Sequence, residues 1–384
     1  MKIVFVSNYF NHHQKALSDE LFRLTDGNYT FISTTLMREE RRQLGYTTLD
    51  VGYELRAYES EEAKEEALRL ISEADVVIAG SADYSYIKDR IKSRRLLFKY
   101  GERPFKNGPE FPKFFGRYVK WNMQYPRTAP VYLLCASAYA AWDYSRMGMF
   151  LNKTYRWAYF TDTRRYDDIA ELMANKRKNS LLWVARFLDW KHPEQAVDVA
   201  ARLKNDGFCF ELAFIGIGPE KEKIVNAVEA NGLHDCVRFL DAMSPDEVRN
   251  HMEQSEIFLI TSDKREGWGA VVNEAMNSGC AVIGSHEAGS VPFLINDGIN
   301  GMIFQTGNTD MLYEKTRYLL EHPEERAKLG KKACETITDL WNADVAAQRF
   351  TELAQRILSG EKSPDLYPEG PCSKASVITD RWKN

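Results

Sequence analysis

The stretch Ser262–Cys280, SDKREGWGAVVNEAMNSGC, carries the most specific chemical pattern in this sequence. An apolar run, Ile257–Ile260, precedes it, and a helix-like segment, Ala270–Asn277, follows a charged loop and ends before Gly279. Strand, loop and helix in this order form the repeating unit of a parallel α/β sheet. We therefore expect the loop Lys264–Gly269 at the carboxyl end of a strand, where such sheets bind ligands.

Two glutamates and two glycines give this loop and helix a chemical preference. Glu266 lies in the loop, and Glu274 follows eight positions later on the predicted helix. Gly267 and Gly269 allow the backbone to approach a ligand closely, and the start of a helix attracts phosphate. Carboxylates beside a phosphate must face another group, and sugar hydroxyls donate hydrogen bonds that carboxylates accept. The stretch is therefore interpreted as a site for a sugar joined to phosphate.

Length, charge and cysteine spacing exclude several classes of protein. With 384 residues the chain is long enough for two or three domains, and its net charge of −4 gives no general attraction to nucleic acid. The six cysteines have no metal-type spacing, which favours reduced residues in a cytosolic protein. Met1–Phe10 is too short for a signal peptide, and no run approaches the length of a membrane span. We expect a cytoplasmic protein that is able to touch a membrane surface.

The motifs EGWG, NEAM and the Glu-x7-Glu spacing of Glu266 and Glu274 resemble the signature of the retaining nucleotide-sugar glycosyltransferases of family four. The resemblance is specific over roughly Leu181–Phe350 and thin before it. It implies the α/β fold called GT-B, in which two doubly wound Rossmann-like domains face a cleft. The expected parts are an acceptor-side domain at 1–170 and a nucleotide-sugar-binding domain at 171–342. A helix at 343–360 would return to the first domain, and a polar tail would follow at 361–384.

Two cations follow the strand that opens the second α/β series. Arg186 lies at the end of this strand and Lys191 at the start of the next helix, so both are expected to project into the cleft. Fixed cations stabilise a leaving diphosphate as its negative charge grows. The segment looks like the Arg-x4-Lys diphosphate pair of the family; the alternative is two solvated loop cations.

The resemblance assigns roles to further residues. Glu266 would contact hydroxyls of the donor sugar and Glu274 those of the ribose, and the family retains configuration by front-face attack with the leaving phosphate as base. No metal or cofactor is required, because the two cations take the role of a metal ion. His286 is better explained as a satisfied loop histidine. Gly267, Trp268 and Gly269 would offer backbone amides near the sugar and phosphate. The turn with Gly216 and Gly218 would lie beside the nucleotide, although a tight turn alone also explains these two glycines.

The first strand–helix loop departs from the family. Relatives carry a glycine pair there, whereas the loop Ser7–His13 has none. Asn11 is predicted to cap the following helix and to form a capping box with Gln14. His12 and His13 are the histidines of the first domain, and one of them is expected near the acceptor or the phosphate.

The implied activity is metal-independent transfer of a hexose from a UDP- or GDP-linked donor. The acceptor would be a sugar or a lipid-linked sugar in the synthesis of cell-surface polysaccharide or glycolipid. A nucleotide-sugar epimerase or hydrolase of the same fold, and a non-catalytic binding protein, remain as alternatives. A dinucleotide oxidoreductase is disfavoured because neither α/β series opens with G-x-G-x-x-G.

A basic and aromatic segment lies in the first domain. Between Lys88 and Arg127 there are twelve basic and three acidic residues. If Pro112–Tyr125 is helical, one aromatic stripe lies beside a basic stripe. This stripe either packs into the core, with the cations solvated, or contacts an anionic membrane at the inner face. The two stripes are Phe114, Tyr118, Trp121 and Tyr125, and Lys113, Arg117 and Lys120.

Overall fold

The computed structural model of this chain describes residues 1–37, 49–108 and 113–382. The chain divides into two compact units. The first unit comprises Met1–Asp162 and Trp341–Thr379, and the second comprises Thr163–Leu340 and Asp380–Asn384. Pro112, the expected start of the basic and aromatic helix, lies outside the described residues.

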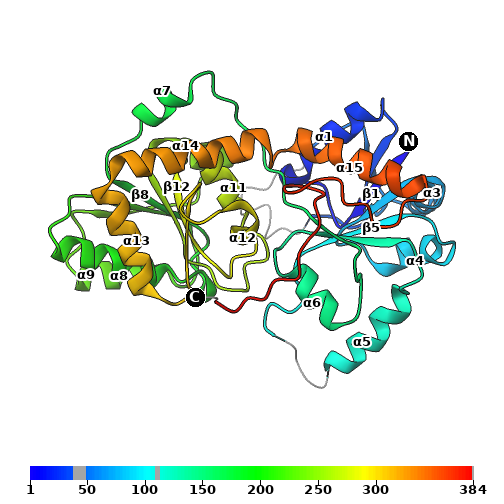
Figure 1. Ribbon diagram of the computed structural model, residues 1–384, viewed down its shortest axis with the longest axis horizontal. Helices are drawn as coiled ribbons and strands as arrows, with labels where there is room; N and C mark the ends of the chain where they lie inside the picture. Colours follow the sequence, from blue (N-terminus) through cyan, green and yellow to red (C-terminus); the bar gives the residue numbers. More distant parts are fainter. Residues whose placement is uncertain (38–48, 109–112, 383–384) are drawn as a thin grey trace. The chain divides into compact units, whose positions relative to one another are not determined.

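The first unit is built on a parallel sheet whose described strands follow the order β3-β2-β1-β4-β5-β6-β7. Its strands are short apolar runs, and every residue of β1, β4 and β6 is buried. Helix α1 packs against α15, and Figure 1 shows the orange α15 beside the blue α1 although the two are far apart in sequence. The elements are β1 (Ile3–Ser7), α1 (His12–Leu24), β2 (Tyr29–Ser33), β3 (Glu54–Arg56), α3 (Glu61–Glu73), β4 (Val76–Ala79), α4 (Tyr84–Lys92), β5 (Leu97–Gly101), α5 (Lys113–Gln124), β6 (Val131–Cys135), α6 (Ala140–Arg146), β7 (Thr154–Arg156) and α15 (Ala343–Leu358).

The second unit contains a parallel sheet with the order β10-β9-β8-β11-β12-β13 in the described part of the chain. Helix α8 packs with α9 and α13, while α11 packs with α10 and α14 (Figure 1). The elements are α7 (Ile169–Ala174), β8 (Ser180–Val184), η1 (Asp189–Lys191), α8 (Pro193–Asn205), β9 (Glu211–Ile215), α9 (Lys221–Ala230), β10 (Val237–Leu240), α10 (Pro245–Gln254), β11 (Ile257–Ile260), α11 (Ala270–Asn277), β12 (Ala281–Ser285), α12 (Val291–Leu294), β13 (Met302–Phe304), α13 (Thr309–Glu321) and α14 (Pro323–Asp339).

The strand order places one topological switch point in each sheet. In the first sheet β1 lies between β2 and β4, and in the second sheet β8 lies between β9 and β11. In each sheet the connections that follow the two strands at the switch point, β1 and β4 or β8 and β11, run in opposite directions along the sheet. This leaves room for a ligand beyond the carboxyl ends of these strands. The doubly wound fold class predicted from the sequence is confirmed. The predicted loops Ser7–His13 and Lys264–Gly269, and the segment that carries Arg186 and Lys191, all follow switch-point strands.

The segment predicted to be a polar tail is part of the first unit. Residues 372–375 pair with the edge strand β7, where Arg156 N–H donates to Ser373 O at 2.8 Å and Cys372 N–H donates to Arg156 O at 2.9 Å. The side chain of Cys372 is buried. The tail prediction was wrong because three prolines and scattered polar residues conceal a segment that covers a sheet edge. The polar segment that leads into the second unit is also ordered in part, since α7 packs against α14.

We expect the covered sheet edge to matter for stability. Cys372→Asp places a charge in a buried site and should lower the free energy of unfolding by about 3 kcal/mol or more. Val377→Asp is the matched control, because Val377 lies in the same segment and is 59% exposed. Urea unfolding of both variants measures the difference. Equal unfolding free energies of the two variants would show that the segment contributes no stability and behaves as a free tail.

Candidate functional site

The second unit brings the two predicted loops together at its switch point. Strands β8 and β11 are neighbours, with Leu181 beside Ile257 and Leu182 beside Phe258 in the register. The loop after β8 carries Arg186 and Lys191, and the loop after β11 carries Glu266. Because parallel neighbours end at the same edge of the sheet, the two loops start side by side.

An ion pair joins these loops at their centre. Lys191 Nζ pairs with Glu266 Oε2, and the two side chains are only 11% and 12% exposed. The ammonium group also lies over the Trp190 ring, 4.3 Å from its centroid. Ser262 Oγ donates to the same carboxylate oxygen at 3.3 Å. The site therefore holds a paired cation and anion in a position that water reaches poorly.

Arg186 differs from Lys191 in its surroundings. It lies two residues beyond the end of β8 and is exposed. Among the described residues no ion pair is found for its guanidinium. Of the two cations predicted to act together, the Lys191 ammonium is therefore already paired with Glu266, and the Arg186 guanidinium is available to a ligand.

Backbone and side-chain contacts clamp the Lys191 segment to the β11 loop. Thr261 Oγ1 donates to Lys191 O at 2.6 Å and accepts from Trp183 Nε1 at 3.0 Å. Asp263 N–H donates to Trp190 O at 3.0 Å. These bonds fix the backbone that carries Lys191 by way of a threonine and a tryptophan of the core.

His192 closes this clamp in a strained conformation. Its φ of 49° and ψ of 50° are left-handed, which is uncommon for a residue with a side chain. The imidazole nitrogens lie 3.3 Å from Asp263 Oδ2 and 2.9 Å from Glu194 Oε1. These hydrogen bonds, the one to Asp263 first, raise the pKa of His192 to about 9. Burial alone would raise the pKa of Asp263, but hydrogen bonds from His192 and Arg265 outweigh it and lower the pKa to about 2.

Steric contact with the neighbouring loop explains why the two positions after β9, Gly216 and Gly218, are glycines. A Cβ on Gly216 would lie 2.1 Å from Ala185 O, and one on Gly218 would lie 2.4 Å from Phe187 O. Phe187 N–H donates to Ile217 O at 2.9 Å across the same contact. The glycines therefore allow the β9 loop to support the segment that carries Arg186. Their predicted approach to a nucleotide stays a prediction.

The EGWG segment presents its backbone while its tryptophan is internal. The Trp268 side chain is fully buried, and its Nε1 donates to Asn273 Oδ1 at 2.8 Å. Gly269 has a φ of 89° and precedes the first turn of α11. A helix start offers N–H groups that have no partner within the helix. With Gly267, this segment can therefore contact a ligand through amides and not through the indole.

Glu274 lies on α11 and keeps some exposure to solvent. Burial nevertheless raises the pKa of this carboxyl to about 7, against the opposing effect of Arg249 and Arg164. A ligand hydroxyl that donates to the carboxylate would favour its charged form. The environment of Glu274 therefore fits a group that gains a hydrogen-bond partner on ligand binding.

The first unit places the glycine-free loop at its own switch point. Asn11 caps α1 as predicted, with Oδ1 accepting from His13 N–H at 2.9 Å. The capping box is not completed, because the Gln14 side chain does not reach back to the cap. The His12 and His13 rings lie 4.0 Å apart, and burial lowers the pKa of His12. One polar residue was missed here: Lys99 donates from Nζ to Gly80 O at 2.9 Å, and burial lowers its pKa to about 8.

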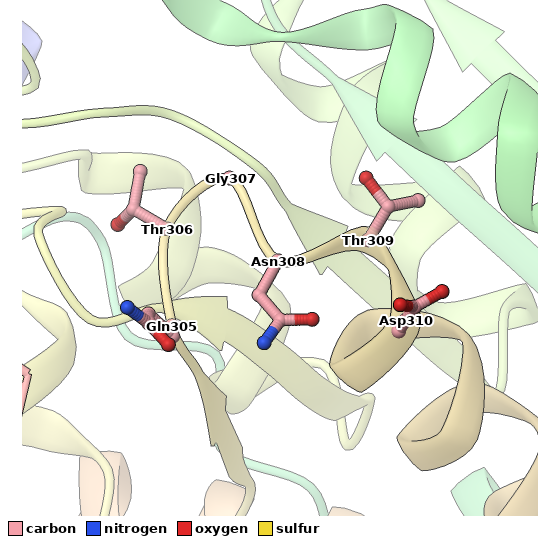
Figure 2. A pocket seen from close by; sticks show the side chains of 6 residues that line it. All are labelled: Gln305, Thr306, Gly307, Asn308, Thr309 and Asp310. Carbon is pink, nitrogen blue, oxygen red and sulfur yellow. The ribbon is translucent and has the colours of Figure 1, made fainter.

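The prediction for His286 is confirmed. Its Nδ1 lies 3.0 Å from Thr306 N–H, and its Nε2 lies 3.1 Å from Asp380 O, so both ring nitrogens are used by the fold. Figure 2 shows the neighbouring turn, whose side chains line a depression of about 570 Å³. This lining contains none of the predicted site residues; it consists of Gln305, Thr306, Gly307, Asn308, Thr309 and Asp310.

No group of three or more His, Cys, Asp or Glu side chains is arranged to hold a metal ion in the described part of the chain. No helix of the described ranges is both long and apolar enough to cross a membrane.

Comparison with known proteins finds a family model that matches part of the chain and solved structures that share its fold. The model of the family Glycosyl transferases group 1 matches residues 165–336. Amylovoran biosynthesis glycosyltransferase AmsK of Erwinia amylovora is 25% identical over 182 residues, which cover 46% of this chain and 44% of that protein. Uncharacterized glycosyltransferase MJ1178 of Methanocaldococcus jannaschii is 33% identical over 155 residues, 40% of this chain and 42% of that protein. The chain thus spans less than half the length of the curated relatives it matches.

Solved structures match nearly the whole chain. Anabaena Alr3699/HepE in complex with UDP superposes with a TM-score of 0.67 at 16% identity, over 92% of this chain and 100% of that one. Sucrose-phosphate synthase from Thermosynechococcus elongatus gives a TM-score of 0.66 at 14% identity, over 94% and 100% of the two chains. At this identity the likeness shows the fold, which is GT-B with two Rossmann-like domains.

The His192 clamp predicts a pH dependence of stability. Because the folded pKa of His192 is raised to about 9, its stabilisation is complete below pH 6.5 and is lost as the pH rises through 9. His192→Asn tolerates the left-handed backbone but removes the charge, so it should cost about 1 to 2 kcal/mol at pH 6 and little at pH 10. Urea unfolding at both pH values measures this. His234→Asn, at an exposed histidine of the same unit, is the control; a His192→Asn penalty independent of pH would contradict the clamp.

Proposed function

We propose that this chain, which carries a group 1 glycosyltransferase domain over residues 165–336, moves a sugar from a nucleotide-diphosphate sugar to an acceptor with retention of configuration. The observation that carries the proposal is the arrangement at the β8/β11 switch point. There an exposed arginine, a paired lysine and a glutamate meet beside a helix start. Alr3699/HepE, which has the same fold, has been solved with UDP and with UDP-glucose.

Donor binding would rearrange the Lys191–Glu266 pair. A diphosphate carries more negative charge than one carboxylate, so it competes for the Lys191 ammonium and also attracts Arg186. Glu266, released from the lysine, then accepts hydrogen bonds from hydroxyls of the donor sugar. The sugar is thereby oriented by the same carboxylate that kept the lysine in place before binding.

The chemistry follows from where charge develops. As the bond between the anomeric carbon and the diphosphate oxygen breaks, negative charge grows on the diphosphate, and both cations stabilise it. An acceptor hydroxyl attacks from the same face, and its proton passes to the departing phosphate oxygen. Arg186 and Lys191 serve where other enzymes use a divalent cation, so we propose metal-independent transfer.

Further residues complete the proposed donor site. Glu274 would accept from ribose hydroxyls, and amides of Gly267, Trp268 and Gly269 would contact the sugar and phosphate. Gly216 and Gly218 would lie beside the nucleotide. His12, His13 and Lys99 at the switch point of the first unit are proposed to contact the acceptor or the phosphate in place of the missing glycine pair.

We further propose that the product is a cell-surface polysaccharide or glycolipid and that the chain acts in the cytoplasm. AmsK is named for amylovoran biosynthesis, and the Escherichia coli relative WcaL for colanic acid biosynthesis. Both names support an acceptor that is a growing sugar chain, which bacteria commonly carry on a lipid.

Incubation with a panel of UDP- and GDP-linked hexoses, with release of free nucleoside diphosphate as the readout, tests the function. We expect acceptor-dependent release from one donor, unchanged by EDTA, and NMR of the product should show the anomeric configuration of the donor. Release that needs no acceptor would identify a hydrolase, and a donor that is isomerised without release would identify an epimerase. Binding without either reaction would leave a binding protein.

The two cations should affect turnover more than donor binding. Arg186→Ala and Lys191→Ala are each expected to lower kcat about a hundredfold, which corresponds to roughly 3 kcal/mol of transition-state stabilisation. Lys223→Ala, at an exposed lysine of α9, is the matched control. Near-normal kcat in both site variants would show that Arg186 and Lys191 do not stabilise the diphosphate.

Substitutions of the two carboxylates should affect different steps. Glu274→Gln is expected to weaken nucleoside diphosphate binding, whereas Glu266→Gln should chiefly lower kcat because it contacts the transferred sugar. Titration calorimetry with UDP and GDP, alongside kinetics, separates the two. Equal losses of nucleotide affinity in both variants would refute this division.

A further inference from the structure

Helix α5 packs one row of half-buried rings against the rest of the first unit. The ring centroids of Phe114 and Trp121 lie 5.6 and 6.4 Å from that of Phe105. The ring of Tyr125, just beyond the helix, lies 5.9 Å from a neighbouring phenylalanine of the same unit. Except for Tyr118, the aromatic stripe singled out in the sequence is therefore the inner face of α5.

A second apolar row on α5 faces solvent. Phe115 is 65% exposed, Val119 57% and Met123 76%, and their spacing of four residues places them on one stripe. Tyr118, beside them, is 39% exposed. The described residues include 13 large apolar side chains that are exposed, and these four fall within twelve consecutive positions. Such a concentration is typical of an interaction surface rather than of scattered exposure.

Cations flank the exposed row. Lys113, Arg117 and Lys120 recur at the spacing of a second helical stripe, and α5 contains no acidic residue. Lys113 and Lys120 are exposed, and Arg117 is half-buried. The outer surface of α5 thus combines an apolar stripe with positive charge, in a chain whose net charge is −4.

Among the described residues, two acidic side chains on elements near α5 are paired elsewhere, and one interacts with a cation of the helix. Asp143 is buried, with an oxygen 3.1 Å from Arg103 Nη2. Glu102 pairs with a lysine and accepts from Tyr159 Oη at 2.8 Å. Asp83, which caps α4, is the acidic group that interacts with Lys120. Of the three described carboxylates considered, Asp83 weakens the positive field, and it does so near Lys120.

We propose that the outer face of α5 docks on the surface of a bilayer that contains anionic lipid. Phe115, Val119 and Met123 enter the boundary between headgroups and acyl chains, while Arg117 and Lys120 contact lipid phosphates. This inference deepens the proposed function and rests on it in one respect, because a docked transferase would meet a lipid-linked acceptor at that surface. The docking itself needs no catalysis.

Charge selects the bilayer over other partners. A second copy of this chain would bring two identical basic helices together, which costs repulsion. A nucleic acid would use the cations but would leave the apolar row in water. Of these three partners, the anionic bilayer satisfies both stripes at once.

The test is flotation of the full chain with vesicles of phosphatidylcholine alone or mixed with phosphatidylglycerol, at low and high salt. We expect salt-sensitive binding to the mixed vesicles and weak binding to the neutral ones. Arg117→Glu with Lys120→Glu should reduce binding at least about 25-fold, since each cation contributes about fivefold. Val119→Ser with Met123→Ser should reduce binding about tenfold without changing its salt dependence.

Lys88→Glu with Lys92→Glu on α4 is the matched control for charge, and we expect less than about a twofold effect. No binding of the unmodified chain at low salt would overturn the proposal, as would equal losses from the α4 and α5 reversals. Self-association that the Val119/Met123 variant abolishes would assign the face to a second copy instead. Release of nucleotide in solution with a soluble acceptor should be unchanged in the α5 variants, so failure of docking is distinguishable from failure of the transferase function.

Discussion

The ion pair between Lys191 and Glu266 is the interaction on which the rest of the candidate site depends. It joins the loops that follow β8 and β11, and both side chains are nearly enclosed. Removing either partner would leave a charge in a poorly hydrated place, which costs more than the pair itself contributes to stability. The pair is therefore better understood as an arrangement that keeps both groups charged and ordered, and the proposed donor binding would use both groups.

Several features around the pair serve to hold its geometry. Thr261 and His192 fix the backbone of the lysine segment, and Gly216 and Gly218 let a third loop support Arg186. The left-handed conformation of His192 is an example of local strain that surrounding contacts over-determine. Because the clamp uses the histidine in its charged form, the structure links the position of Lys191 to pH.

The sequence predicted the second unit better than the first. Runs such as Ile257–Ile260 and Ala270–Asn277 have one clear period and clear ends, so the prediction matches β11 and α11. The role of His192 was missed because its partners, Asp263 and Glu194, come together only in the folded chain. Lys99 had one signal, a lysine within an apolar strand.

On α5 two apolar rows lie side by side, and periodicity alone does not tell which of them faces the core. The exposed row of Phe115, Val119 and Met123 therefore emerged only from the structure. The covering of β7 by residues 372–375 depends on backbone pairing, which leaves no apolar pattern.

We propose that the Lys191–Glu266 pair opens to receive the donor diphosphate. A crystal structure of the full chain with a bound nucleoside diphosphate tests this most directly. The account predicts that phosphate oxygens lie within hydrogen-bond distance of Lys191 Nζ and the Arg186 guanidinium, and that Glu266 has left the lysine and faces the place of the sugar. A nucleotide bound elsewhere, or one bound with the Lys191–Glu266 pair intact, would contradict it.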